Sequence, residues 1–111
     1  MTISESEFDA LAAKTLERIM AVVDDEVPDV VEAIPSSGVV RLDFQGRRQP
    51  CIVNSQRAAL QIWVAAERRA WHFAYAGDGE VLRWKHTKSD DELFATLEGL
   101  LSEHAGVSVE F

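Results

Sequence analysis

The sequence contains a single cysteine and no run of apolar residues long enough to cross a bilayer. One thiol, Cys51, excludes an intramolecular disulfide and is typical of proteins from reducing compartments. A membrane-spanning helix needs roughly 20 consecutive apolar residues, and no segment of the sequence approaches this length. The first residues also lack the basic and apolar regions of a secretory signal. We therefore expect a cytoplasmic protein without contact with a membrane.

Motifs that mark catalytic and nucleotide-binding proteins are absent too. The sequence has no glycine-rich phosphate loop, no cysteine pair for zinc and no HExxH motif. Its histidines, His72, His86 and His104, lack the spacing of metal ligands, and no elbow motif marks a nucleophilic serine. We therefore expect that the protein is not an enzyme. Cys51 lies in a strand-like segment and is interpreted as a small buried apolar residue.

Positive charge is scarce in the first part of the chain. The 111 residues carry a formal net charge of −8. Residues 1–46 hold ten acidic residues against three basic ones, and the remaining residues hold nine against eight, so the first part accounts for −7 of the charge. An excess of carboxylates disfavours nucleic acid, whose phosphates would repel it. The uneven distribution favours a negative surface for cations or a basic partner, with ordinary solubilising charge as the alternative.

Hydropathy periodicity predicts one α+β domain over residues 1–111. Residues 4–25 show the spacing of an amphipathic helix, which Ser4 or Ser6 would cap and Pro28 would end. The period then changes to two, which is typical of half-buried strands joined by short turns. This alternation predicts about six antiparallel strands, at residues 29–34, 39–44, 49–54, 60–66, 70–75 and 80–86.

A second helix is expected after the strands. Ser89 and Glu92 fit a capping box with Ser89 as the N-cap, and Gly106 is a natural C-terminal stop. The tail at 107–111 is expected to pack back onto the domain. Helices at both ends of a strand meander can lie side by side on one face of the sheet. The sequence thus predicts a two-layer α/β sandwich whose other sheet face is open to water or to a partner.

The alternation within the strands indicates which side chains occupy this open face. If Ile62 and Val64 point toward the helices, then Gln61 and Trp63 point away from them, as does His72 on the next strand. Tryptophan is among the residues most often found at interaction hot spots. The pattern alone leaves a second alternative open, because a slip of one residue would bury Trp63 in the core.

Carboxylates are the remaining candidates for chemistry. Five of them lie along the outer face of the first helix and in the following loop: Glu17, Asp24, Asp25, Glu26 and Asp29. Oxygen ligands suit hard cations such as Fe³⁺, Mn²⁺, Ca²⁺ and Mg²⁺. Because exposed side chains on a helix do not converge into a cage, we expect weak, labile binding that salt screens. The alternative is a solvated helix face without a ligand.

Three segments of the predicted sheet form a distinctive signature: Asn54-x-Gln56, Gln61-Ile62-Trp63-Val64-Ala65 and Trp71-His72-Phe73. This signature resembles the sheet of the bacterial (CyaY-type) frataxin family. Further segments resemble the same family, and they are Ser6-Glu7-Phe8, Asp24-Asp25, Gly38-Val39-Val40 and Gly106-Val107-Ser108-Val109. The similarity therefore runs over nearly the whole chain, and it implies the frataxin α-β sandwich.

The resemblance implies an iron-binding accessory protein of iron–sulfur cluster assembly. Such a protein would bind Fe²⁺ or Fe³⁺ weakly through an acidic ridge. It would contact the cysteine desulfurase and the scaffold protein and act as an iron-dependent regulator. Two alternatives stay open: a ferroxidase or iron donor, and a protein-interaction module that works without metal. We expect a monomer, with oligomerisation in the presence of iron as the alternative.

Matching positions in the family imply the metal ligands. Asp24 and Asp25 match acids of the ridge, and Asp9 takes a position where a bacterial relative has a metal-binding histidine. With the neighbouring acids, the expected ligands are Asp9, Glu17, Asp24, Asp25, Glu26 and Asp29. The chain departs from the family at Met20 and Ala21, where relatives carry paired glutamates, so its ridge is thinner.

The open sheet face is the expected partner surface. Trp63 and its neighbours Asn54 and Gln61 match the outward surface that relatives use for partner contact, and His72 lies beside them in the predicted sheet. The resemblance thus favours the alternative in which Trp63 is exposed. Ala70 replaces a glycine that is common before the aromatic residues of this strand.

Overall fold

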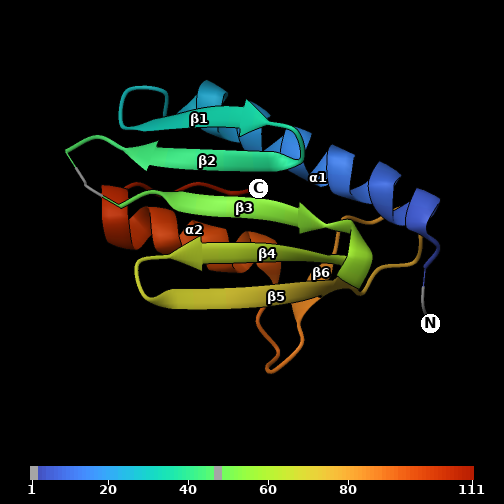
Figure 1. Ribbon diagram of the computed structural model, residues 1–111. Helices are drawn as coiled ribbons and strands as arrows, with labels where there is room; N and C mark the ends of the chain where they lie inside the picture. The colour runs from blue at the N-terminus through green and yellow to red at the C-terminus, as the bar shows by residue number, and fades with distance from the viewer. Residues whose placement is uncertain (1–2, 47–48) are drawn as a thin grey trace.

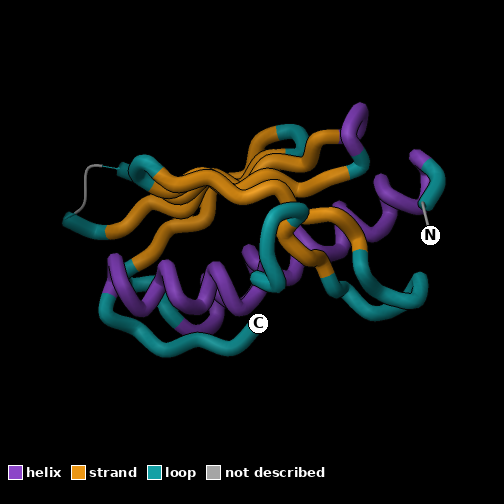
Figure 2. Tube along the Cα trace, turned by 90° about the horizontal axis from the view of Figure 1, so that it is seen from below, coloured by secondary structure: helices purple, strands orange, loops and turns teal. Residues whose placement is uncertain are grey.

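The structure has two layers, a β-sheet and a pair of helices packed on one of its faces (Figures 1 and 2). The computed structural model describes residues 3–46 and 49–111, and within these ranges the sheet has six antiparallel strands in the order of the chain. The elements are α1 (Glu5–Glu26), β1 (Val31–Ser36), β2 (Val39–Phe44), β3 (Cys51–Gln56), η1 (Arg57–Ala59), β4 (Gln61–Ala66), β5 (Arg69–Tyr75), β6 (Trp84–His86) and α2 (Leu93–Ala105). The predicted α+β sandwich is confirmed.

Helix α1 begins with a capping box. The Ser4 hydroxyl accepts a hydrogen bond from the Glu7 N–H (3.1 Å), and the Glu7 carboxylate accepts one from the Ser4 N–H (3.0 Å). The bond from the Ser4 N–H, and to a smaller extent the Ser4 hydroxyl, stabilise the Glu7 carboxylate and hold its pKa below the ordinary value. One stripe of the helix faces the sheet and is buried, and it consists of Phe8, Leu11, Ala12, Thr15, Leu16, Ile19 and Val23. The predicted helix at 4–25 and its apolar stripe are thus confirmed.

The first hairpin has a two-residue turn. Ser37 (φ 37°) and Gly38 (φ 80°) both lie in the left-handed region, as this tight type of turn requires. The strand before the turn starts at Val31 rather than at the predicted residue 29. The reason is that the N–H groups of Val30 and Val31 both donate to the Val27 carbonyl, which makes a turn directly after the helix.

Strands β2, β4 and β5 agree with the prediction within one residue, but β3 begins two residues later than predicted. The larger error is β6, which spans 84–86 instead of 80–86. The Asp78 carboxylate accepts hydrogen bonds from the N–H groups of Glu80 and Val81, and the Tyr75 hydroxyl donates to the Val81 carbonyl. These bonds fold the segment into a loop, so it does not continue the sheet.

The predicted start of the second helix at Ser89 is also wrong. The Ser89 hydroxyl accepts from the Asp91 N–H instead, which makes a local turn. Glu92 is the N-cap of α2 without a side-chain cap, and an isolated bridge pairs it with Lys85 of β6. At the other end Gly106 (φ 66°) stops the helix in a left-handed conformation, as predicted.

The chain after α2 packs back across the two helices. The Phe111 ring stacks on Phe94 of α2 with ring centroids 5.7 Å apart. The Arg18 guanidinium of α1 lies over the same Phe94 ring and donates to the Phe111 carbonyl at 2.7 Å. The prediction that the tail packs back onto the domain is confirmed, and the structure places it against α1 and α2 on the side of the helices away from the sheet (Figure 2).

Trp84 joins the helix layer to the last strand of the sheet. Its side chain is buried, and its indole N–H donates to the Thr15 hydroxyl of α1 at 2.9 Å. The Thr15 hydroxyl in turn donates to the Leu11 carbonyl at 2.7 Å. Phe8 and Tyr75 meet the indole edge-on, with ring centroids 5.7 and 5.3 Å away. This buried polar contact fixes where α1 lies on the sheet.

Thr15→Val should lower the free energy of unfolding by roughly 2 kcal/mol, because it leaves the buried Trp84 N–H without an acceptor. Denaturant unfolding of Thr15→Val, Trp84→Phe and the double variant measures the coupling. We expect a coupling energy of about 1 kcal/mol or more. In the Trp84→Phe background the indole N–H is already absent, so Thr15→Val should lower the free energy of unfolding only a little further. If the losses in the free energy of unfolding of the two single variants add up to the loss of the double variant, this hydrogen bond contributes nothing to stability.

Cys51 should be inert toward alkylation in the folded protein. Its thiol is fully buried, and burial raises its pKa to about 12. At pH 8 the thiolate fraction is then about a thousandfold lower than that of a free cysteine. Iodoacetamide labelling followed by mass spectrometry should find modification only after unfolding. Rapid labelling of the native protein would contradict this burial.

Candidate functional site

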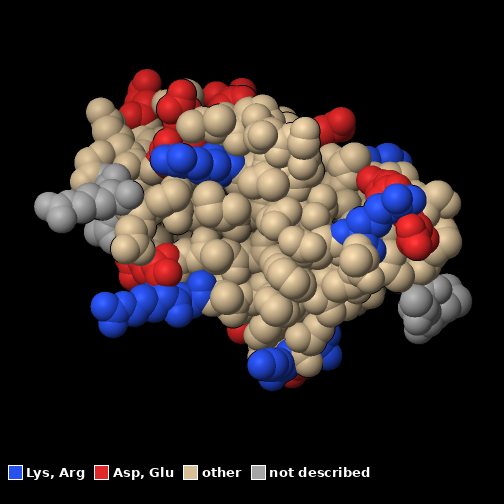
Figure 3. Space-filling model, in the orientation of Figure 1, with Lys and Arg blue, Asp and Glu red and all other residues tan. Residues whose placement is uncertain are grey.

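The acidic side chains of α1 lie on its solvent-facing side. Glu17, Asp24, Asp25 and Glu26 are all exposed, and so is Asp29 in the turn after the helix. In Figure 3 acidic atoms gather along the upper edge of the molecule, over α1 and β1. No ion pair joins these five side chains to any other residue that the structure describes. Their charge is therefore available to a cation or a basic partner.

These carboxylates do not form a coordination cage. Among the residues at 3–46 and 49–111, no group of three or more His, Cys, Asp or Glu side chains could hold a metal ion. Asp24, Asp25 and Glu26 follow one another on the helix, so their side chains point in different directions around its axis. Carboxylate oxygens still suit a hard cation such as Fe³⁺. The residues fit a hydrated, labile ion held by one or two oxygens at the surface.

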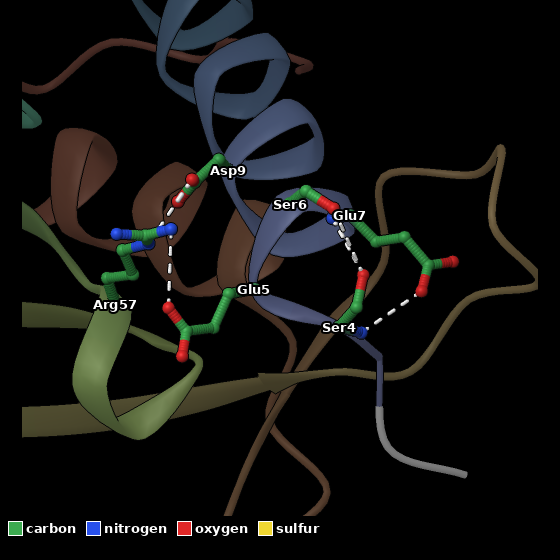
Figure 4. A network of polar contacts seen from close by, with 6 residues as sticks. All are labelled: Ser4, Glu5, Ser6, Glu7, Asp9 and Arg57. Carbon is green, nitrogen blue, oxygen red and sulfur yellow. Dashed lines mark hydrogen bonds and ion pairs between the residues drawn. The ribbon is translucent and has the colours of Figure 1, made fainter.

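Asp9 lies apart from the other expected metal ligands and already has a cationic neighbour. The Arg57 guanidinium, from η1, contacts the Asp9 carboxylate at 3.2 Å and the Glu5 carboxylate at 3.3 Å (Figure 4). Asp9 and Asp24 are about 22 Å apart along the helix, at 1.5 Å per residue. The structure thus does not bring the six expected ligands together, and a metal ion at Asp9 would have to compete with Arg57.

The four expected partner-binding residues do come together, on the open face of the sheet. The strand register places Trp63 between Asn54 on one side and His72 on the other. The Trp63 and His72 rings stack with centroids 4.3 Å apart and planes 12° from parallel. The Trp63 indole N–H donates to the Gln61 side-chain oxygen at 2.8 Å. Trp63 is half-buried and outside the core, so the prediction that it points away from the helices is confirmed.

A small hollow of about 150 Å³ lies beside this stack. Its floor is the cross-strand pair of Ala65 and Ala70, and Ile52 forms part of its wall. Strand alternation alone does not predict this hollow. The signal in the sequence was two small residues at outward positions beside a large aromatic one. A shallow apolar depression next to an aromatic edge suits a side chain of a protein partner better than a reaction centre.

The three histidines have separate structural roles. His72 stacks on Trp63, and His86 Nδ1 lies 3.1 Å from the His72 backbone nitrogen. His104 stacks on Phe44 with centroids 5.4 Å apart, and its Nδ1 lies 3.3 Å from the Glu67 carboxylate. His72 and His86 are thus neighbours on β5 and β6, whereas His104 lies apart from them on α2. Among the described helices, none has the length and apolar character needed to span a membrane.

Comparison with known proteins gives one consistent match. The model of the frataxin-like domain matches residues 1–107. The chain is 40% identical to a protein named "Iron-sulfur cluster assembly protein CyaY" from Cupriavidus taiwanensis, over 98% of this chain and 96% of that one. It is 39% identical to a protein of the same name from Cupriavidus necator, over 96% of this chain and 95% of the other.

The fold is also similar to that of a solved frataxin. A frataxin from Psychromonas ingrahamii, studied as a model of stability within the CyaY family, has a TM-score of 0.85 to this structure, with 97% of each chain covered and 23% sequence identity. This likeness supports the fold, whereas the family assignment depends on the domain match and the sequence relatives. Since both extend over nearly the whole chain, this protein belongs to the frataxin-like family.

Proposed function

We propose that this protein regulates iron–sulfur cluster assembly by binding iron weakly and by contacting the cysteine desulfurase and the scaffold protein. The observation that carries the proposal is a pair of separate recognition surfaces. One consists of exposed carboxylates at the end of α1 that form no ion pair with a residue in 3–46 or 49–111, and the other is the Trp63–His72 stack on the open sheet face. The names of the relatives, which refer to iron–sulfur cluster assembly, support the same role.

The acidic surface would take iron as a cargo or signal. Asp24 and Asp25 would contact the hydrated ion, with Glu17, Glu26 and Asp29 adding negative potential nearby. An ion that binds there neutralises part of the charge that also attracts a basic patch on the desulfurase. Charge complementarity of this kind sets the rate of encounter and its salt dependence more than the final affinity. Iron occupancy would in this way change how often the complex forms.

The sheet face would bind the scaffold. Trp63 is oriented before binding, because His72 covers one face of its ring and Gln61 holds its N–H. A preoriented aromatic side chain loses little entropy on binding, which favours affinity. The hollow above Ala65 and Ala70 would receive an apolar side chain of the partner.

The proposed role is not catalytic. A ferroxidase needs paired iron ions in a preorganised site, whereas exposed carboxylates on a helix surface offer little preorganisation. The cytoplasmic location and the monomeric state expected from the sequence stay predictions of this proposal.

The double substitution Asp24→Asn and Asp25→Asn should weaken binding of Fe²⁺, or of Co²⁺ as its surrogate, at least about tenfold. Amide spectra recorded during titration would show which residues respond first. The matched control is Asp90→Asn with Asp91→Asn, an adjacent exposed pair with the same change in charge near α2. Equal loss in both double variants would contradict a site on α1. Catalytic Fe²⁺ oxidation that disappears only in the α1 variant would favour the ferroxidase alternative.

Trp63→Ala should weaken scaffold binding by about 2 kcal/mol, the size expected of a hot spot. It should cost less stability than the roughly 3–5 kcal/mol of a fully buried aromatic residue, since Trp63 is only half-buried. Calorimetric titration and denaturant unfolding measure the two effects. Val81→Ala is the control, because Val81 is an exposed apolar residue (55%) in the β5–β6 loop. A large loss of stability with unchanged scaffold binding would disprove the proposed partner surface.

A further inference from the structure

A groove of about 290 Å³ lies between α1 and the turn of the β1–β2 hairpin, and it shares Glu17 with the acidic surface. Leu16 of α1 and Val40 of β2 are buried and close its floor. Pro35 and Val39 line it on the hairpin side, and the exposed Ala13 lies at its rim on the helix. Figure 1 shows α1 passing behind this hairpin. The groove is open at its middle because Ala13 on the helix edge and Ser36, Ser37 and Gly38 on the hairpin edge have small side chains or none.

The hairpin edge of the groove is held in place. The Ser55 N–H and the Ser55 hydroxyl both donate to the Gly38 carbonyl, at 2.9 and 3.1 Å. A side chain at Gly38 would meet the Ser55 hydroxyl at 2.8 Å, so the turn has no space for a larger residue. The groove is therefore preformed, and a ligand would not have to order it on binding.

Negative charge lines the helix side of the groove. Asp9, Ala13 and Glu17 follow at intervals of four residues, so they form one row along the rim. Asp24 lies seven residues beyond Glu17, or about two turns, and thus on the same side of the helix. This face of α1 therefore has an apolar gap at Ala13 between carboxylates.

The charge is not even along the groove. At the N-terminal end Arg57 pairs with both Glu5 and Asp9, which offsets part of their charge. At the other end Glu17 and Asp24 have no ion pair with any residue that the structure describes. A ligand that matches this pattern is apolar near Ala13 and cationic toward the C-terminal end of α1.

We propose that this groove docks an extended basic segment of a protein partner, which inserts one apolar side chain over Ala13 and places basic side chains near Glu17 and Asp24. This inference rests on the proposed function, because it adds a specific contact to the acidic surface. Ala13 is about 6 Å from Glu17 and about 16 Å from Asp24 along the helix axis. At about 3.3 Å per residue, the segment carries its basic residues roughly two and five positions from the apolar one.

Two synthetic peptides of equal charge test this directly: acetyl-Gly-Leu-Gly-Lys-Gly-Gly-Lys-amide, and the same peptide with serine in place of leucine. Each is titrated into the full-length ¹⁵N-labelled protein. The leucine peptide should bind about tenfold more tightly, because it buries its apolar side chain. It should shift the amides of Ala13, Leu16 and Val39 as well as those of Glu17 and Asp24, whereas the serine peptide should shift only the last two.

Ala13→Trp fills the groove from an exposed helix position and should reduce binding of the leucine peptide to the level of the serine peptide. Ala10→Trp is the matched control, since Ala10 is also exposed on α1 but does not line the groove, and it should change nothing. Glu17→Gln with Asp24→Asn should weaken both peptides alike. Unfolding curves verify that each variant is folded.

Equal binding of the two peptides, or a leucine preference that survives Ala13→Trp, would overturn the inference. Hexylammonium binding as tightly as the leucine peptide would overturn it too, in favour of a small amine as the ligand. Failure of the proposed function has a different signature. In that case purified desulfurase would not bind at low or high salt, while the leucine preference in the groove would persist.

Discussion

Burial of the apolar stripe of α1 against the sheet is the contact on which the rest of the structure depends. It is fixed in position by the buried Trp84 N–H, which bonds to Thr15, and by aromatic contacts to Phe8 and Tyr75. Because a helix has two sides, burying this stripe turns the acidic side chains toward solvent. Because a sheet has two faces, covering one with helices leaves the other open. Both candidate recognition surfaces follow from this one contact.

The two surfaces have different chemistry and suit different tasks. The carboxylates of α1 act at a distance and are sensitive to salt, so they suit encounter with a cation or a basic protein. The Trp63–His72 stack acts only on contact and depends on shape. Arg57 adds a further distinction, since it offsets charge at one end of α1 and leaves the other end available. In the proposed role this separation matters, because an ion bound to the carboxylates would alter the first surface without changing the second.

The sequence was sufficient for the architecture because local signals agreed with it. The helical stripe, the change of period after Pro28 and the turn at Gly38 are all local features. The errors arose where a contact with a distant residue or a competing local bond decided the outcome. Strand β6 is short because Tyr75 and Asp78 bond to the loop. The contact of Arg57 with Asp9 joins segments that are far apart in the chain, and no local sequence pattern predicts it. Strand alternation left two orientations open for Trp63, and the resemblance to the family favoured the exposed one, which the strand register confirms by placing Trp63 beside Asn54 and His72.

The central claim is that α1 and the open sheet face are independent recognition surfaces of one assembly protein. A double-mutant cycle tests this most directly, with the free energy of forming the complex with desulfurase and scaffold as the measured quantity. The cycle combines Trp63→Ala with the Asp24→Asn and Asp25→Asn pair. Independent surfaces predict that the two losses add within about 0.5 kcal/mol. A coupling energy well above that value would contradict the account. So would unchanged binding free energy in Trp63→Ala alone or in the Asp24→Asn and Asp25→Asn pair alone.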